Sequence, residues 1–511
     1  MASPCEQSGS CSARLDKLPS PPSQMDLKRE TIWIDGDREL AAPGRMLLTC
    51  RPASIFVFLS LVFGSIIIFA NPPLRGPDEI AHFLRIYSYA RGELLPVTEI
   101  NSRKGIFVSP GLYNQLYFFK TAGEVFAKSA EEGMRYGHIM AEYSRLANIE
   151  DDETEQASMF APFAGTEGYN PVAYIPYIVA AEIGHLLKLD FPAMLLLMRF
   201  FGLLAFTAVA AYAITVTPAL KWAFVLIAML PVSLYNRTVL SADGAALSYA
   251  MAITALCFSA ATRKSAVGRV WERSIWMTLC VLGKQPQIIF VLLELMVSRL
   301  KELPRRWRSL AIVVLPGLIL SPLWVIAVSA DIAVWRLLEE RNDSFEQFDP
   351  LWKLLYMWEH PYHFPLAAWT ALSGWADRLW QELIGIVGWQ DILLPLWTYL
   401  VLTILLLLVP IQKLQLDGAV RARVAVITGL AVLGYFVLVY LIFFLIYTPI
   451  DTDHVRGVQG RYFVIALPAA AVFIAALVNC ELPRGVPAAI AIAGSMIAGI
   501  TTLEAVLRPH W

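Results

Sequence analysis

The residues best suited to chemistry follow the first apolar run of the chain. The segment RGPDEIAHFLRIY, residues 75–87, places Asp78, Glu79, His82 and Arg85 directly after a stretch long enough to cross a bilayer. A carboxylate whose pKa is set by burial and by neighbouring charges can act as a general base. In a helix, positions 78, 82 and 85 lie on one face. We therefore predict Asp78, Glu79 and His82 as catalytic residues and Arg85 as a substrate-binding residue.

A purely structural interpretation of this segment stays open. Pro77 suits the first position of a helix, and the two following carboxylates, Asp78 and Glu79, would lie in its first turn. Negative charge there is favoured by the helix dipole. Asp78 would then cap a helix and take no part in chemistry.

Two later segments carry further candidates. In YNRTVLSADG, Asp243 stands at the start of an apolar helix and follows Arg237, although a loop cap would also explain it. The segment DHVRGVQGR precedes another apolar helix and contains five candidates for substrate binding: Asp453, His454, Arg456, Gln459 and Arg461. Its two arginines and a glutamine fit the clamping of phosphate groups, although Arg461 could equally extend to the membrane interface.

The elements that must position these residues are apolar helices. The 511 residues are 57% hydrophobic and only 16% charged, which indicates a polytopic membrane protein of all-α class. A net charge of -1 gives no reason to expect a nucleic-acid partner. Nine apolar segments are long enough to predict spanning helices: 46–70, 192–216, 222–235, 242–261, 309–329, 392–411, 424–447, 461–479 and 486–506.

Basic residues give these segments an orientation. Lysines and arginines cluster in four places, which the positive-inside rule makes cytoplasmic: 14–45, 263–273, 299–308 and 413–423. Residues 1–45, rich in Ser, Pro and charge, are predicted to be a disordered cytoplasmic tail, and 46–511 a transmembrane domain.

The predicted outer side carries the candidate residues. It includes the long loop 71–191, with a membrane-surface or re-entrant helix at 171–187, and the tryptophan-rich loop 330–391. Between the second and third basic clusters, the sequence GKQPQ divides two apolar pieces, each too short to span the membrane comfortably. We therefore predict a pair of short helices that enters the membrane from the cytoplasm and returns to it. No CxxC or HExxH motif is present, so no metal site is expected.

The sequence also resembles a known family. The motifs PDEIAHF, GYNPVAYIPYIVAAEIGHLL, LPVSLYNRTVLSADG, LGKQP and VQGRYFVIALP resemble uncharacterised bacterial polytopic membrane proteins related to the GT-C glycosyltransferases. The likeness covers nearly the whole chain except the tail. It implies a GT-C-like bundle of about 11–13 transmembrane helices in the bacterial cytoplasmic membrane, with the active site on the outer face and juxtamembrane helices in the long outer loops.

The resemblance also implies partners and roles. A polyprenyl-phosphate-linked sugar would be the donor, and a glycan or lipid the acceptor. Asp78 would be the base, with Glu79 as its rival, and Asp243 the second acid. Metal-dependent members place paired acids in the second outer loop, whereas Asp243 stands alone here. No cofactor is therefore expected.

The expected reaction is an inverting sugar transfer. Asp78 would deprotonate an acceptor hydroxyl, while Arg456 or Arg461 would neutralise the departing lipid phosphate. Two alternatives are a transporter or flippase for lipid-linked sugars and a non-catalytic assembly partner. A transporter would be expected to show internal repeats and charges at the bilayer midplane, whereas the acids of this chain concentrate at one predicted surface.

Overall fold

The computed structural model describes most of the chain beyond residue 50. The described ranges are 51–98, 104–116, 135–147, 158–163, 165–262, 269–298, 303–328, 350–450, 452–478, 480–483 and 485–511. The predicted tail, 1–45, and residues 330–349 of the tryptophan-rich loop lie outside them.

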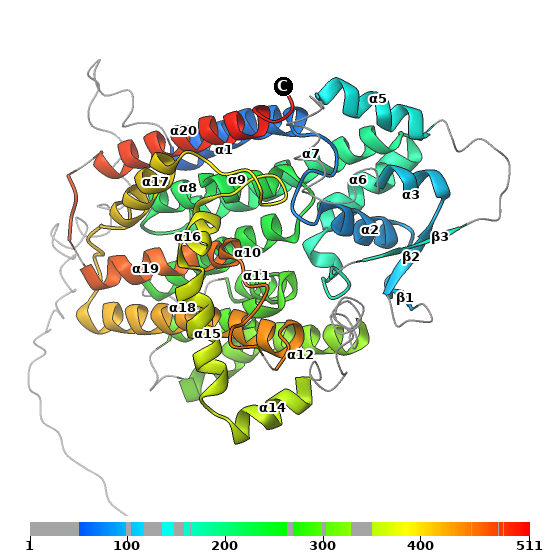
Figure 1. Cartoon of the computed structure of the whole chain (residues 1–511). Helices are drawn as coiled ribbons and strands as arrows, with labels where there is room; N and C mark the ends of the chain where they lie inside the picture. Colours follow the sequence, from blue (N-terminus) through cyan, green and yellow to red (C-terminus); the bar gives the residue numbers. More distant parts are fainter. Residues whose placement is uncertain are drawn as a thin grey trace, which may run out of the picture. The chain divides into compact units, whose positions relative to one another are not determined.

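Long apolar helices dominate the described residues, as the composition predicts. Seven helical stretches are long and apolar enough to cross a membrane. They are α1 (Pro52–Ala70), α7 (Phe191–Val216), α10 (Ala242–Thr262), α12 (Leu303–Val328), α18 (Gly418–Tyr447), the continuous pair η7 (Gly460–Ala466) and α19 (Leu467–Val478), and α20 (Val486–Leu507). Figure 1 shows most of these helices running in a common direction, with α10 in the middle.

The remaining apolar segments form shorter or broken helices. The described residues therefore contain seven long spans, compared with the 11–13 transmembrane helices predicted. The predicted span 222–235 is divided at Pro231 into α8 (Lys221–Met229) and α9 (Pro231–Thr238). A proline lacks the N–H that a continuous helix needs, but it suits the first position of a new one. The segment 392–411 yields only α17 (Leu396–Leu408).

The break at GKQPQ is where the sequence predicts it. α11 (Val270–Gly283) ends there, and η4 (Gln285–Met296) begins directly after Lys284, whose backbone is extended. Both elements pack against α10 and against each other. The short pair therefore brings Lys284 into the bundle.

The first predicted outer loop has a structure of its own. It contains α2 (Glu79–Ala90), α3 (Pro110–Leu116), α5 (Tyr136–Ala147), the turn η3 (Pro171–Ala173) and α6 (Ile175–Leu186). A small antiparallel sheet, which the sequence analysis does not predict, has the order β1 (Val97–Thr98), β2 (Lys104–Val108), β3 (Met159–Pro162). In its register Val97 faces Gly105, and Ile106 faces Ala161. These elements gather beyond one end of the long helices (Figure 1).

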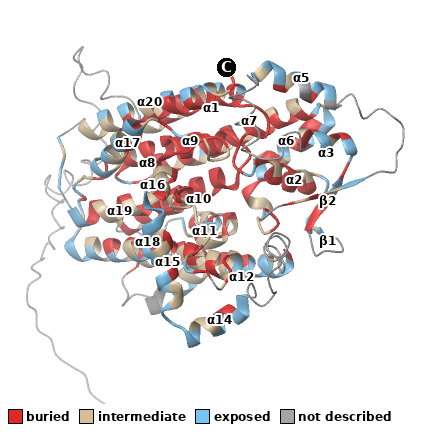
Figure 2. Ribbon diagram, in the orientation of Figure 1, coloured by how far each residue is buried: buried red, intermediate tan, exposed pale blue. Residues whose placement is uncertain are grey.

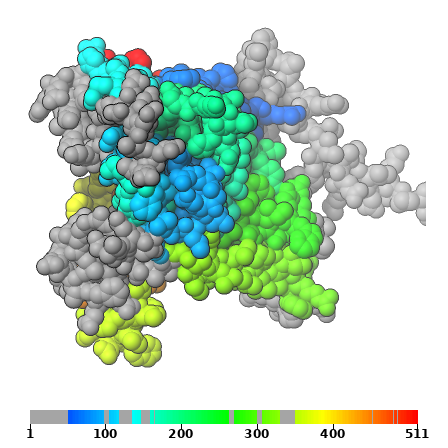
Figure 3. Space-filling model, turned by 90° about the vertical axis from the view of Figure 1, so that its right-hand side faces the viewer, coloured from blue at the N-terminus to red at the C-terminus, as the bar shows by residue number. Residues whose placement is uncertain are grey.

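The second predicted outer loop forms α14 (Pro350–Glu359), α15 (His363–Gly374) and α16 (Ala376–Ile384). α14 is held to the end of α18 by Lys353, whose buried ammonium donates to the carbonyl oxygens of Phe444 and Leu445 at 2.8 and 3.2 Å. Figure 3, which faces the end where the first loop lies, shows blue residues of that loop beside green ones, with yellow-green α14 at the lower edge.

Burial identifies α10 as the centre of the bundle. Nearly all of its residues are buried, and it packs against α7, α11 and η4. Small residues such as Ala245, Ala246 and Ala250 let neighbouring helices approach closely. Figure 2 shows the contrast between the buried α10 and the exposed faces of α12 and α14. The first residues of α10 thus lie at the end of a well-packed core.

Candidate functional site

Four segments that are far apart in the sequence meet at one end of the bundle. They bring together four charged side chains, which we call the charged centre: Asp78, Asp243, Lys284 and Arg461. Nη2 of Arg461 donates to Oδ2 of Asp78 at 2.9 Å, and its Nε lies 3.8 Å from Oδ2 of Asp243. Lys284 forms an ion pair with the other carboxylate oxygen of Asp243. Four places in the chain therefore converge: the segment after α1, the start of α10, the break between α11 and η4, and the segment before α19.

Asp78 is the exposed member of this centre. Its side chain is 61% exposed, whereas those of Asp243, Lys284 and Arg461 are 5–7% exposed. Residues 71–77 and Glu79 are all buried. Asp78 precedes α2 in a left-handed conformation, with φ 54°, and its side chain makes no capping hydrogen bond. The structure therefore does not support the capping interpretation, because the carboxylate turns to Arg461 instead.

Glu79 lies in a different environment from its neighbour. Its fully buried carboxylate accepts two hydrogen bonds from Arg199, at 2.8 and 2.7 Å. It also accepts from the backbone N–H groups of Gly76 and Leu240 at 2.9 and 3.0 Å. Glu79 thus ties α2 to α7 and to the segment before α10, and its oxygens face these partners.

His82 lies beside the charged centre on the next turn of α2. Its Nδ1 is 2.6 Å from the hydroxyl of Tyr174. Burial lowers the pKa of His82 to about 4, and the carboxylates of Asp78 and Asp243 offset only part of this effect. Burial also raises the pKa of the Tyr174 hydroxyl well above its usual value. At neutral pH His82 is therefore an uncharged hydrogen-bonding group.

Two of the predicted substrate-binding arginines make their contacts elsewhere. The guanidinium of Arg85 lies 4.2 Å from the ring centre of Tyr89 and donates to the carbonyl oxygen of Leu94 at 3.0 Å. Arg237 donates to the hydroxyl of Ser60, in the middle of α1, at 3.3 Å. Helical spacing places Arg85 on the face of His82, but three-dimensional packing directs both arginines into other contacts.

The segment before α19 is divided between the centre and the surface. Oε1 of Gln459 accepts from Nε of Arg461 at 2.7 Å, so Gln459 belongs with the centre. Asp453 is 85% exposed and pairs with His454 at 2.7 Å. Arg456 is anchored through its backbone N–H, which donates to the hydroxyl of Thr448. Of the five residues predicted here, Gln459 and Arg461 reach the charged centre through their side chains.

Gly460 explains how Arg461 is positioned. A side-chain carbon at Gly460 would collide with the carbonyl oxygen of Leu379 in α16, so only glycine permits this close approach. The N–H of Gly460 donates to Oε2 of Glu382 at 2.6 Å, and Arg378 holds the other oxygen of Glu382 at 2.9 Å. α16 thereby fixes the backbone from which Arg461 extends.

Lys284 is the member of the charged centre that the sequence analysis does not single out. Its ammonium lies 4.7 Å from the ring centre of Tyr462 and 5.8 Å from that of Tyr169. The available signal was a lysine at the break between two apolar pieces, since charges at membrane depth are rarely incidental. The pairing of Lys284 with Asp243 could not be predicted from their spacing in the sequence.

The segment after α16 closes over the segment after α1. Arg75 donates to Asp391 at 2.6 Å, and the indole N–H of Trp389 donates to the carbonyl oxygen of Leu74 at 2.7 Å. Gln390 donates to Gln459 at 2.9 Å. These contacts hold the two predicted outer loops together around the charged centre.

The chemistry available at the centre follows from its charges. Two buried cations, Lys284 and Arg461, can bind an anion, and an exposed carboxylate, Asp78, can accept a proton. No group of three His, Cys, Asp or Glu side chains in the described part of the chain is placed to hold a metal ion.

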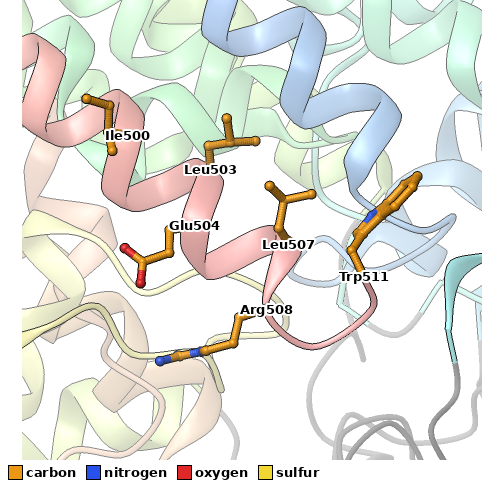
Figure 4. A pocket seen from close by; sticks show the side chains of 6 residues that line it. All are labelled: Ile500, Leu503, Glu504, Leu507, Arg508 and Trp511. Atoms are coloured by element: carbon orange, nitrogen blue, oxygen red, sulfur yellow. The ribbon is translucent and has the colours of Figure 1, made fainter.

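A surface groove lies apart from these residues, along the end of α20. It is lined by Ile500, Leu503, Glu504, Leu507, Arg508 and Trp511. Glu504 and Arg508 extend from the opposite side of the helix to Leu503 and Leu507 (Figure 4). The indole N–H of Trp511 donates to the carbonyl oxygen of Ala70, the last residue of α1. The groove shares no residue with the charged centre.

Comparison with known proteins identifies a family. The model of a family described as predicted membrane protein (DUF2142) matches residues 61–470. The match includes every residue of the charged centre. No curated protein and no solved structure matches the chain.

Proposed function

This chain belongs to the DUF2142 family of predicted membrane proteins, and from its charged centre we propose that it is a membrane glycosyltransferase. The donor is a polyprenyl-phosphate-linked sugar, and the acceptor is a glycan or a lipid. The observation that carries this proposal is the pairing of exposed Asp78 with Arg461 beside the buried ion pair of Asp243 and Lys284.

The proposed reaction is a single displacement. The carboxylate of Asp78 takes the proton of an acceptor hydroxyl, and the hydroxyl oxygen forms a bond to the anomeric carbon of the donor. The bond from that carbon to the phosphate oxygen breaks, and its electron pair leaves with the lipid phosphate. Lys284 and Arg461 stabilise the negative charge on the departing phosphate. One displacement inverts the anomeric configuration.

The proposed location is the outer face of the bacterial cytoplasmic membrane. α18 carries Arg421 and Arg423 in its first turns, and its other end leads through residues 448–459 to Arg461. The positive-inside rule makes the arginine end cytoplasmic. The charged centre then lies at the opposite surface, where a lipid-linked donor and an envelope acceptor could both reach it.

The test is a transfer assay with purified protein in nanodiscs. Polyprenyl-phosphate donors carrying labelled glucose, galactose, mannose or arabinose are incubated with heat-treated glycan and lipid extracts as acceptors. We expect transfer by the parent protein and a loss of about 10²–10⁴-fold for Asp78→Asn, which removes the base. Asp453→Asn, at an exposed carboxylate on the neighbouring segment, should retain full activity.

Two results would contradict the proposal. Absence of transfer and of donor cleavage with every donor would rule out this reaction class for the sugars tested. Equal rates for Asp78→Asn and the parent would leave the reaction but remove Asp78 as its base.

A further inference from the structure

We propose that Asp78 occupies, in the ligand-free protein, the place on Arg461 that a substrate phosphate takes, so that phosphate binding displaces the carboxylate and releases the base. This inference rests on the proposed function for the role of the released base. The displacement itself concerns binding alone.

The contacts of Arg461 make Asp78 the partner that can leave. Arg461 is buried, and Gln459 and Asp243 approach its Nε from inside the site. Nη2 faces Asp78, whose side chain is 61% exposed, so this contact lies on the solvent side of the guanidinium. Arginine pairs with phosphate through the same donors that it offers to a carboxylate. An incoming phosphate therefore competes with Asp78 for Nη2.

The charges of the centre favour this exchange. Lys284 and Arg461 contribute two positive charges, and Asp243 and Asp78 contribute two negative ones. The charged centre is therefore neutral while Asp78 is paired with Arg461. When Asp78 turns away, one positive charge remains uncompensated at a site with little access to water. Such a charge attracts an anion strongly. The phosphate would restore neutrality.

The backbone of Asp78 supports a two-position carboxylate. Its φ of 54° lies in the left-handed region, which residues other than glycine seldom adopt, although Asp and Asn tolerate it best. Backbone conformations of this kind persist where surrounding contacts enforce them, and they concentrate at functional sites. Here the left-handed turn directs the carboxylate to Arg461 instead of to the N-terminus of α2. Release of the base then depends on arrival of the phosphate group.

The experiment measures binding of farnesyl phosphate to the purified full-length protein in nanodiscs, by calorimetry, for the parent and for Asp78→Asn. Asn retains the backbone preference but removes the competing charge. If Asp78 closes on Arg461 about nine-tenths of the time, the variant should bind about tenfold more tightly. Asp453→Asn should bind like the parent.

Two further ligands separate the phosphate group from the lipid chain. Farnesol, which lacks the phosphate, should bind equally to the parent and to Asp78→Asn. Inorganic phosphate should bind more weakly than farnesyl phosphate but with the same preference for the variant. In an Arg461→Gln background, Asp78→Asn should produce no gain.

The inference fails if Asp78→Asn binds farnesyl phosphate as weakly as the parent, or more weakly, or if farnesol gains equally. It also fails if neither protein binds farnesyl phosphate. If the variant gains affinity while the parent transfers no sugar, the displacement stands and the glycosyltransferase proposal falls.

Discussion

At the scale of single residues, Asp78 and Glu79 are adjacent in the chain but differ in every property that matters to chemistry. Asp78 is exposed and accepts from the guanidinium of Arg461 at 2.9 Å, whereas Glu79 is buried and accepts hydrogen bonds from Arg199 and from two backbone N–H groups. A carboxylate surrounded by fixed donors is poorly placed to collect a proton from a substrate. We therefore assign the proposed base to Asp78 and a structural role to Glu79.

Substitution of Glu79 should reveal this role. Glu79→Gln leaves the buried guanidinium of Arg199 without its charge partner, and breaking a buried ion pair from one side costs about 3–5 kcal/mol. We expect a marked fall in the unfolding temperature of the detergent-purified protein. Glu182→Gln, at an exposed carboxylate of α6, is the matched control and should unfold like the parent. An unchanged unfolding temperature for Glu79→Gln would contradict the structural role.

His82 predicts a pH dependence of stability. Burial lowers its pKa to about 4, below the ordinary value of about 6.5. Between these values the unfolded chain binds a proton that the folded protein excludes, so stability falls as the pH decreases from about 6.5 to about 4. The loss reaches roughly 3 kcal/mol at the acid end.

A substitution isolates this contribution. His82→Gln keeps a hydrogen-bonding group opposite Tyr174 but cannot titrate. Chemical unfolding at pH 7 and at pH 4.5 should therefore show a smaller acid destabilisation for the variant than for the parent. Equal acid sensitivity of the two proteins would show that His82 does not carry the effect.

At the scale of elements, the contact of α16 with η7 positions Arg461 and makes Gly460 indispensable. Gly460→Ala would force its new methyl group against the carbonyl oxygen of Leu379, and overpacking of this kind costs about 1–3 kcal/mol or more. We expect lower stability together with weaker farnesyl phosphate binding, because Arg461 follows directly. Gly374→Ala, where an added carbon meets no atom within 4 Å, should change neither property.

The elements themselves were largely predictable from hydrophobicity. The expected spans 192–216, 242–261 and 486–506 correspond to α7, α10 and α20. The break at GKQPQ was predicted because neither flanking piece spans comfortably. The division at Pro231 was not predicted, although a proline within an apolar run and the more polar residues that follow it were signals for a break. The small sheet was also missed, because strands of two to five residues carry almost no periodic signal.

At the scale of the whole molecule, the candidate site depends on contacts between distant segments. Asp78 and Arg461 are 383 residues apart, and Lys284 pairs with Asp243 across a helical hairpin. The sequence indicated Asp78, Asp243 and Arg461 because each lies at the end of an apolar helix. It could not separate Arg461 from Arg456, or exclude Arg237, because those distinctions depend on how the helices pack.

The orientation of the molecule provides the last prediction. α19 separates the exposed thiol of Cys480 from the exposed side chain of Asp453, which precedes the helix. If the basic ends of the helices are cytoplasmic, Asp453 lies outside and Cys480 inside. In intact cells, a membrane-impermeant maleimide should therefore label an Asp453→Cys variant at position 453 and leave Cys480 unmodified until the cells are lysed, as peptide mapping by mass spectrometry would show.

The reverse pattern would place the charged centre on the cytoplasmic side. The envelope acceptors of the proposed function would then be out of reach. Because both positions flank the same helix, the comparison does not depend on the path of any other span. The native thiol at Cys480 also serves as the internal control for membrane integrity. A single labelling experiment thus decides which aqueous compartment Asp78 faces.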